Sequence, residues 1–296
     1  MKAQVFTPSP ALQPYIDSYV LVDADWSTLD ATAATWRLLP YGQPSLLFLY
    51  GDLHEYSYRS RQDAMQRTTR AFLVGQLTQP IWLKFSGHTR LIKVQVKPAG
   101  MSQFLPLALD ALTDVPSLDL EAVWGRPVDT LLDQLHEAAT DEARVQQLDA
   151  FLLRRLVPKD ALIDYVQYTV GQLQASSGSL TISALESQLG ISRRHLERLF
   201  RSKVGLTPKE LGKIIRLNQA FHRLDADPTL SLTALAHDCG YFDQAHFSRD
   251  FLNLTGLRPS RLLAERPEEL FVTHGRCFTS MRPPAARPAW LAAGVA

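Results

Sequence analysis

A short segment near the C-terminal end of the chain carries polar side chains of four chemistries at the spacing of a helix face. It follows the letters "CGYF" and presents Gln244, His246, Ser248 and Arg249. Amide, imidazole, hydroxyl and guanidinium groups can meet base edges in a major groove, where glutamine pairs with adenine and arginine with guanine. Ala245 could contact a thymine methyl group. For His246 a phosphate contact or a plain surface position stays open.

The same arrangement occurs once more, earlier in the chain. "SALESQLGISRRHLERLFRSKVGLTP" (183–208) aligns with "TALAHDCGYFDQAHFSRDFLNLTGLRP" (233–259). Three positions recur at an offset of 50 residues and five at an offset of 51: Ala184, Leu185 and Gly190, then Leu196, Arg198, Phe200, Gly205 and Pro208. One residue has been added at the second turn. This region is therefore a duplicated unit of two helices around a glycine-containing turn.

Each copy has the pattern of a helix-turn-helix. Apolar residues four apart form the faces that pack at a steep angle, and the glycine allows the left-handed backbone of a tight turn. Ser192 and Asp243 are the expected N-caps of the two second helices. Cys239 replaces Leu189 in the second copy, so we interpret it as a small buried residue, not a reactive thiol.

A long helix is expected between the two copies. Thr207-Pro208-Lys209-Glu210 has the pattern of a capping box with proline at the first helical position. The helix of 207–224, ended by Asp225 to Pro228, would be roughly 27 Å long at ~1.5 Å per residue. Successive major-groove faces of B-DNA lie about 34 Å apart, so one chain could place two reading helices in adjacent grooves.

These residues resemble the AraC/XylS transcriptional regulators, whose DNA-binding domain is two helix-turn-helix motifs joined by a long helix. The resemblance rests on "LGISRRHLERLFRSKVGLTP", "RLNQA" and "CGYFDQAHFSRDFLNLTGLRPS", which cover about the last third of the chain. The chain departs from the usual family residues at Arg223, Leu252 and Leu262-Leu263.

The resemblance implies a role for individual residues. Base contacts are expected from Arg194, Glu197 and Arg198 in the first copy, and from Gln244, Ala245, His246, Ser248 and Arg249 in the second. Phosphate contacts are expected from Ser192, Arg193, Arg201 and Lys203. For any single residue, a solvated surface position is the alternative.

The charge of the chain is unevenly distributed. Its net charge is +1, but residues 1–177 carry −4 and residues 178–266 carry +4. Five basic residues lie between 193 and 203, whereas Arg249 is flanked by Asp243 and Asp250. We therefore predict that the first motif supplies most of the salt-dependent affinity and that the second refines sequence choice.

In the N-terminal half, segments with the pattern of strands are followed by segments with the pattern of helices. "RLLPYGQPSLLFLYGD", "RAFLVGQ", "IWLKFSG" and "RLIKVQVKP" have the pattern of strands, and helices are expected from about residue 101. The fold class is α+β, with strands and then helices over 1–170 and an all-α domain over 178–266. In order and length, 1–170 is similar to the β-rich N-terminal sensor or dimerisation domains of AraC-type regulators. The tail 267–296, rich in Pro, Ala and Arg, is expected to be mostly disordered.

Two features of this half have competing interpretations. Trp36, Arg37, Trp82 and His88 could line a pocket for a small aromatic or anionic effector, or they could be barrel-wall or surface residues. A leucine-rich set could form a dimer seam or an intramolecular core, and its members are Leu131, Leu132, Leu135, Leu148, Leu152 and Leu153.

Composition narrows the function classes. The 296 residues are 46% hydrophobic and 21% charged, which suits two globular domains. No apolar run suggests a membrane span or a signal peptide, so we expect a cytoplasmic protein without membrane contact. Only Cys239 and Cys277 occur, without zinc spacing, and no phosphate loop or GxSxG is present. We therefore predict no enzymatic activity, no cofactor and no metal.

The sequence thus favours a sequence-specific DNA-binding transcription regulator. Its expected partner is double-stranded DNA, with RNA polymerase, a small-molecule effector and a second copy of the chain as further candidates. A constitutive architectural DNA binder and an enzyme fused to a DNA-binding module remain as alternatives. The example of the latter is a repair protein with a nucleophilic cysteine, for which the family precedent implies a metal-bound cysteine near the N-terminus, and residues 1–177 contain no cysteine.

Overall fold

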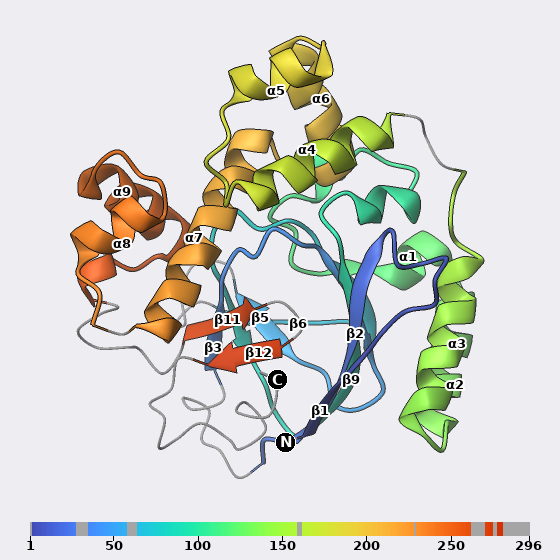
Figure 1. The fold of residues 1–296 in the computed structure, drawn as a ribbon. Coiled ribbons are helices and arrows are strands. Elements are labelled where there is room, and N and C mark those ends of the chain that lie inside the picture. The colour runs from blue at the N-terminus through green and yellow to red at the C-terminus, as the bar shows by residue number, and fades with distance from the viewer. Residues whose placement is uncertain are drawn as a thin grey trace.

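Two β-sheets form the N-terminal part of the computed structural model, which describes residues 2–27, 35–57, 64–158, 162–227, 229–261, 270–274 and 277–280 (Figure 1). In the first sheet the strands run in the order β1 (Lys2–Phe6), β2 (Ile16–Asp25), β9 (His88–Val96), β4 (Ser45–Leu49), β7 (Ala71–Val74) and β10 (Leu118–Asp119). Every neighbouring pair in this sheet is antiparallel.

The second sheet faces the first, and we call the two facing sheets the barrel. Its strands from the N-terminal half are β3 (Thr35–Leu38), β8 (Ile81–Lys84), β5 (Glu55–Ser57) and β6 (Gln66–Arg67). Side chains alternate between the two faces of β9. Leu91 and Lys93 face the space between the sheets, whereas Ile92 and Val94 face the helices. A strand buried on both faces therefore carries two different environments.

Three helices cover the outer face of the first sheet. They are α1 (Leu120–Trp124), α2 (Pro127–Glu137) and α3 (Asp141–Leu153), preceded by the short 3₁₀ helices η1 (Gly100–Gln103) and η2 (Leu109–Leu112). Figure 1 shows α2 and α3 beside β2 and β9. Five of the six leucines considered above for a dimer seam are buried in this core, and only Leu153 is exposed. An intramolecular core therefore accounts for them.

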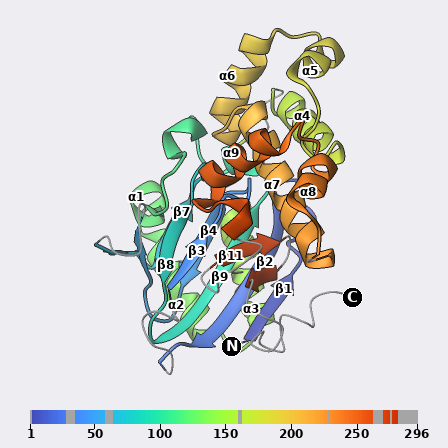
Figure 2. The same cartoon turned by 90° about the vertical axis from the view of Figure 1, so that its left-hand side faces the viewer.

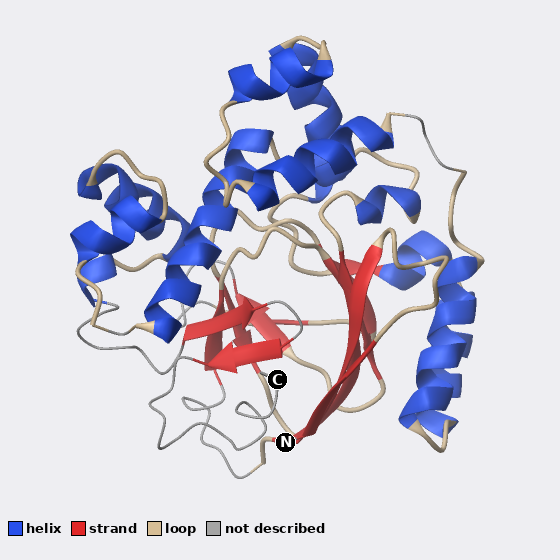
Figure 3. Ribbon diagram, in the orientation of Figure 1, coloured by secondary structure: helices blue, strands red, loops and turns tan. Residues whose placement is uncertain are grey.

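The C-terminal part is entirely helical up to residue 261. It contains α4 (Ile163–Ala175), α5 (Ile182–Leu189), α6 (Arg193–Val204), α7 (Pro208–Ala226), α8 (Leu232–Asp238) and α9 (Gln244–Thr255). Figure 3 shows this helical group above and beside the sheets. The predicted α+β architecture, a β-rich part with following helices and then an all-α part, is confirmed.

Helix α4 packs with the C-terminal helices. Ile163, Val166, Val170 and Leu173 belong to the same core cluster as α5 to α9, whereas Leu152 belongs to the N-terminal cluster. A division at residue 170 therefore cuts through α4, and the change of core falls between 153 and 163. The sequence of α4 shows that one face is apolar, but it does not indicate which of the two cores that face joins.

The expectation for the tail differs from the structure at two segments. Strands β11 (Leu270–His274) and β12 (Cys277–Ser280) form an antiparallel pair, and β11 pairs in parallel with β3. Backbone pairing with an exposed sheet edge can order a segment that has no periodicity of its own. The remaining tail lies outside the described residues. No helix in the described ranges is long and apolar enough to cross a membrane.

Candidate nucleic-acid interface and barrel cavity

Helix α6 is held by its cap and by one apolar face. The Ser192 side chain accepts a hydrogen bond from the His195 backbone N–H at 3.4 Å, so the predicted N-cap is present. Gly190 ends α5 with a φ of +66°, the left-handed conformation that the turn requires. Leu196, Leu199 and Phe200 are buried, which leaves the opposite face of α6 outward.

The outward face of α6 carries two exposed arginines and one ion pair. Arg194 and Arg198 are exposed, and the Arg198 guanidinium lies 3.1 Å from His195 Nδ1. Glu197 is half-buried and accepts from Arg193 Nε at 2.8 Å. Arg194 and Arg198 therefore face outward, as the predicted base contacts require, whereas Glu197 would have to share its carboxylate between Arg193 and a cytosine amino group.

The predicted phosphate-binding residues flank this face. Ser192, Arg193 and Arg201 are exposed and Lys203 is half-buried near the end of α6. Their positions at the two ends of the helix suit contacts to the sugar-phosphate backbone on either side of a groove.

Helix α9 repeats the design. The Asp243 carboxylate accepts from the His246 backbone N–H at 2.7 Å, as predicted for the N-cap. Phe247 and Phe251 turn inward, each about 1% exposed. The outward residues are Gln244, Ala245 and Arg249, which are exposed, and Ser248, which is half-buried.

The ring of His246 lies near Asp250, one turn further along α9. Its Nε2 lies 3.5 Å from the Asp250 carboxylate, and the ring packs edge-on against Tyr241 with centroids 5.2 Å apart. His246 therefore has a structural partner, which favours the alternative to base contact. Sequence reasoning missed Phe242, which is 97% exposed in the turn just before α9. A single aromatic letter in a turn gives no signal of its exposure.

A buried carboxylate joins α9 to the linker helix α7. Asp250 accepts from Lys213 Nζ at 2.7 Å, and its side chain is only 6% exposed. Arg216 of α7 lies 4.6 Å over the ring of Tyr241. Helix α7 begins with the predicted capping box of Thr207 and Glu210. These contacts fix α9 relative to the helix that connects both motifs.

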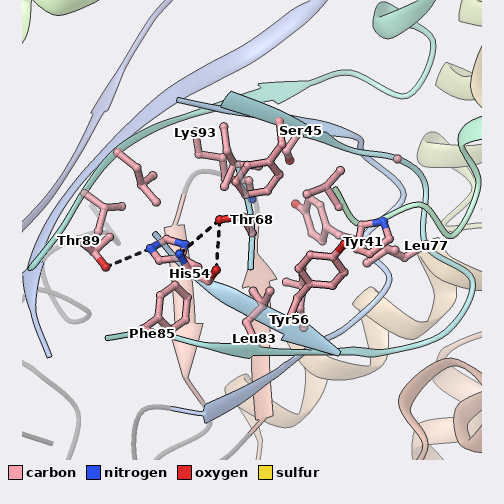
Figure 4. Close-up of a pocket in the computed structure, with 18 of the residues that line it drawn as sticks. Tyr41, Ser45, His54, Tyr56, Thr68, Leu77, Leu83, Phe85, Thr89 and Lys93 are labelled. Carbon is pink, nitrogen blue, oxygen red and sulfur yellow. Dashed lines mark hydrogen bonds between the residues drawn. The ribbon is translucent and has the colours of Figure 1, made fainter. Parts of the chain in front are cut away.

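A cavity of about 100 Å³ lies between the two sheets (Figure 4). Its wall is mostly apolar, with Leu83 and Phe85 among the residues that Figure 4 labels. His54 is buried there and lies 3.1 Å from Thr89 Oγ1. Burial lowers the pKa of His54 to about 4, so this imidazole is neutral at pH 7. Burial also lowers the pKa of Lys93 to about 8, which leaves its amine mostly charged at pH 7.

The three residues predicted for effector binding do not line this cavity. Arg37, Trp82 and His88 are each the strand neighbour of a residue that does: Leu38, Leu83 and Thr89. Successive side chains of a strand point to opposite faces, so each prediction missed the inner face by one position. Arg37 and Trp82 are buried on the outer side, and exposed His88 lies 2.7 Å from Asp23. Trp36 is also buried and packs edge-on against Trp26.

Cys239 has the environment predicted for it. It is 1% exposed in the helical core, and burial raises the pKa of its thiol to about 11. A thiol in this state is inert at pH 7. Within the described part of the chain, no three His, Cys, Asp or Glu side chains are grouped so as to hold a metal ion.

Known protein families match both halves of the chain. Residues 185–265 match a family described as a helix-turn-helix domain, and residues 4–116 match a domain of unknown function, DUF6597. The transcriptional activator RhaS of Pectobacterium atrosepticum is 33% identical over 98 residues, which is 33% of this chain and 35% of RhaS. These matches support an AraC/XylS-family transcriptional regulator.

Other similar proteins cover more of the chain at lower identity. The transcriptional regulator CdhR of Pseudomonas aeruginosa is 26% identical over 180 residues, 56% of this chain and 49% of CdhR. Among solved structures, ToxT from Vibrio cholerae aligns with 83% of this chain and 96% of its own, at 12% identity and a TM-score of 0.43. The chain spans about a third to a half of the curated relatives' length.

Proposed function

We propose that this chain is a sequence-specific DNA-binding transcription regulator that reads one operator with two helices. The observation that carries the proposal is the duplication of a capped helix whose outward face is polar. Arg194 and Arg198 of α6, and Gln244 and Arg249 of α9, are exposed side chains with major-groove chemistry. The family membership of residues 185–265 supports the same reading.

The linker helix supports simultaneous reading. Helix α7 has 19 residues, which gives a length of about 28 Å at ~1.5 Å per residue. Adjacent major-groove faces lie about 34 Å apart on one side of B-DNA. A rigid element of this length suits two reading helices that enter successive grooves.

The two motifs contribute differently to the affinity for DNA and to the choice of sequence. Helix α6 presents Arg193, Arg194, Arg198 and Arg201 on its exposed surface, whereas on α9 the exposed cation is Arg249. Phosphate contacts release counterions and make affinity depend on salt. The first motif therefore supplies most of the salt-dependent affinity, and the second adds sequence preference.

The barrel cavity is the proposed effector site. A volume of about 100 Å³ suits a molecule no larger than one aromatic ring, because the dry cavities that bind benzene are larger, at about 150 Å³. Lys93 supplies a cation and His54 a neutral imidazole to an otherwise apolar wall. We therefore expect a small apolar molecule with one acceptor or anionic group. It would act by population shift, binding better to one arrangement of the domains.

The remaining partners follow from this activity. A transcription regulator works where the DNA is, so we expect the chain in the cytoplasm, in contact with RNA polymerase at its promoter. A second copy is a further expected partner. The cavity favours an effector-controlled regulator over a constitutive architectural binder, and the proposed activity needs no catalytic residue, cofactor or metal.

Selection from a random DNA pool with the full chain, repeated at several salt concentrations, tests the proposal. We expect an enriched motif with two blocks about one helical turn apart. Salt-sensitive binding without an enriched motif would support the architectural alternative. No binding at all would move the search for the function to the N-terminal half.

A further inference from the structure

Both reading helices rest their C-terminal ends on the N-terminal part. Helix α6 ends at Gly205 and α9 at Gly256, with φ of +89° and +69°. The last carbonyl groups of a helix have no partner within it and carry its negative dipole end. Donors placed there by another element can therefore fix the direction of the helix.

At the end of α9 the donor is Arg37. Its Nη1 donates to the Thr255 carbonyl oxygen at 3.0 Å, and its guanidinium lies 4.5 Å over the ring of Trp82. Trp82 is the cross-strand partner of Arg37, so β3 and β8 hold the stack together. Arg37, Trp82 and Thr255 are 9%, 7% and 0% exposed, which keeps the hydrogen bond away from water.

At the end of α6 the donor is Thr113. Its hydroxyl donates to the Gly205 carbonyl oxygen, directly after η2. The fit is close, because a Cβ on Gly205 would lie 2.9 Å from the Leu109 carbonyl oxygen. Figure 2 shows α6 and α9 on the same side of the sheets.

Both donors are connected to the cavity wall, Arg37 through its strand neighbour and Thr113 through Asp114 and Gln76. Leu38 and Leu83, the strand neighbours of Arg37 and Trp82, line the cavity from the other face. Thr113 precedes Asp114, whose backbone N–H donates to the Gln76 carbonyl oxygen at 2.7 Å. Gly75 and Leu77, on either side of Gln76, also line the cavity. We therefore expect a molecule that displaces the wall at these positions to move one or both donors.

We propose that Arg37 and Thr113 are positioning residues that clamp the two reading helices to the barrel, and that occupancy of the cavity changes the relative placement of these helices through the clamps. This inference rests on the proposed function of the chain. Because each clamp touches one helix, each governs one block of the operator.

The full chain tests the clamps through DNA selection with two variants that remove one donor each. Arg37→Met is expected to reduce discrimination at the block read by α9 roughly tenfold, since a buried charge-assisted hydrogen bond is lost. Thr113→Val is expected to do the same at the block read by α6, and each variant serves as the control for the other. Arg67→Met, on exposed β6, is the matched control and should select the wild-type motif.

A second readout separates positioning from loss of fold. Hydrogen exchange of the amides of 251–257 should rise in Arg37→Met, while those of 200–206 should not. Arg37→Lys keeps a donor but loses the planar stack on Trp82 and should restore part of the discrimination. If Arg37→Met does not fold, the Arg37→Lys result decides: wild-type discrimination and exchange there would overturn the clamp.

A cavity-filling variant tests the link to the cavity. Val74 lines the cavity, and Val74→Phe adds a ring-sized group without touching either clamp. We expect Val74→Phe to change the preference for the spacing of the two blocks. In the double variant with Arg37→Met and Thr113→Val present, it should change nothing further, because coupled sites are not additive. An unchanged preference in Val74→Phe would overturn the link.

The outcomes distinguish the two levels of inference. If the wild-type chain selects no motif, the proposed function fails. If the wild-type chain selects two blocks and both clamp variants read them as Arg67→Met does, the clamp inference fails while the function stands.

Discussion

At the residue scale, position along α6 is expected to separate side chains that would carry sequence information from those that would carry affinity. Arg194 is exposed in the first turn of α6, where a guanidinium can reach a guanine edge. Arg201 is exposed in the last turn of α6, where we expect the sugar-phosphate backbone of the DNA to lie. The two residues have the same chemistry and differ in position, so they form a matched pair.

Arg194→Ala and Arg201→Ala should therefore lose binding in different ways. Arg194→Ala is expected to cost about 1–3 kcal/mol on the selected operator and to relax the preference at one base pair. Arg201→Ala should weaken all sequences nearly equally and reduce the salt slope by about one. Titrations at several salt concentrations, on operators mutated one base pair at a time, measure both effects. Equal relaxation in the two variants would contradict the assignment.

Lys93 provides a prediction from burial alone. Its pKa of about 8 in the folded chain lies below the ordinary value of 10.5, so the unfolded state binds more protons between these pH values. The stability of the wild-type chain should therefore rise with pH across this window, relative to Lys93→Met, by about 3 kcal/mol. Below pH 8 the full cost of burying the charge is present, and Lys93→Met should be the more stable protein.

Denaturant unfolding of both chains from pH 7 to 10.5 checks this. Groups other than Lys93 titrate in both proteins and cancel in the difference. A stability difference that stays constant with pH would mean that Lys93 keeps its ordinary pKa in the folded chain.

The reading faces could be predicted residue by residue because helix caps and apolar spacing are local. Ser192 and Asp243 cap their helices as predicted, and Cys239 is buried as predicted. The cavity residues could not be predicted in this way. In a strand covered on both faces, Arg37 and Leu38 have no local feature that assigns either one to the inside.

At the element scale, α7 is the part that both motifs share. Lys213 of α7 and Asp250 of α9 form an ion pair whose carboxylate is almost fully buried. Removing one partner of such a pair leaves an uncompensated charge, whereas replacing both by apolar residues can be neutral. The pair is therefore a test of how firmly α9 is held.

Lys213→Met should destabilise the chain on the order of 2 kcal/mol, and adding Asp250→Leu should recover most of that loss. Denaturant unfolding of the wild-type, the two single variants and the double variant gives the coupling free energy. Additive losses, with no recovery in the double variant, would show that the two side chains do not depend on each other.

The glycines after α5 and α6 provide a matched comparison of strain and contact. Gly190 and Gly205 both have positive φ, but a Cβ at Gly190 would meet nothing within 4 Å. At Gly205 it would lie 2.9 Å from the backbone of η2. Gly190→Ala should therefore cost about 1–2 kcal/mol from the left-handed backbone alone.

Gly205→Ala should cost more than Gly190→Ala and should also weaken the docking of α6 on the barrel. Thermal unfolding measures the first effect, and hydrogen exchange in η2 measures the second. If the two variants lose the same stability and exchange in η2 is unchanged, α6 is not docked in solution as it is here.

Element types were easier to predict than element partners. The capping box at Thr207 and the glycine turns fixed the helices of the C-terminal part from the sequence alone. Helix α4 and strand β11 show the limit, because each joins a partner distant in the sequence. Which core an amphipathic helix enters depends on tertiary contacts that no local pattern encodes.

At the scale of the whole molecule, hydrogen bonds connect the barrel around the cavity to α6, α7 and α9. The Tyr41 carbonyl oxygen accepts from Asn218 of α7 at 3.0 Å, and Tyr41 also lines the cavity. Contacts at both helix ends and at α7 leave the cavity close to every part that would meet DNA. Affinity for an effector can therefore be converted into a change in DNA binding.

The central claim is that one chain reads two adjacent major grooves at once, and operator spacing tests it most directly. Binding of the full chain is measured on the selected operator and on versions with about 5 or about 10 base pairs inserted between the blocks. The account predicts a large loss of affinity with either insertion, because α7 has a fixed length of 19 residues. Affinity that is unchanged by both insertions would show that only one helix reads DNA at a time, and would contradict the account.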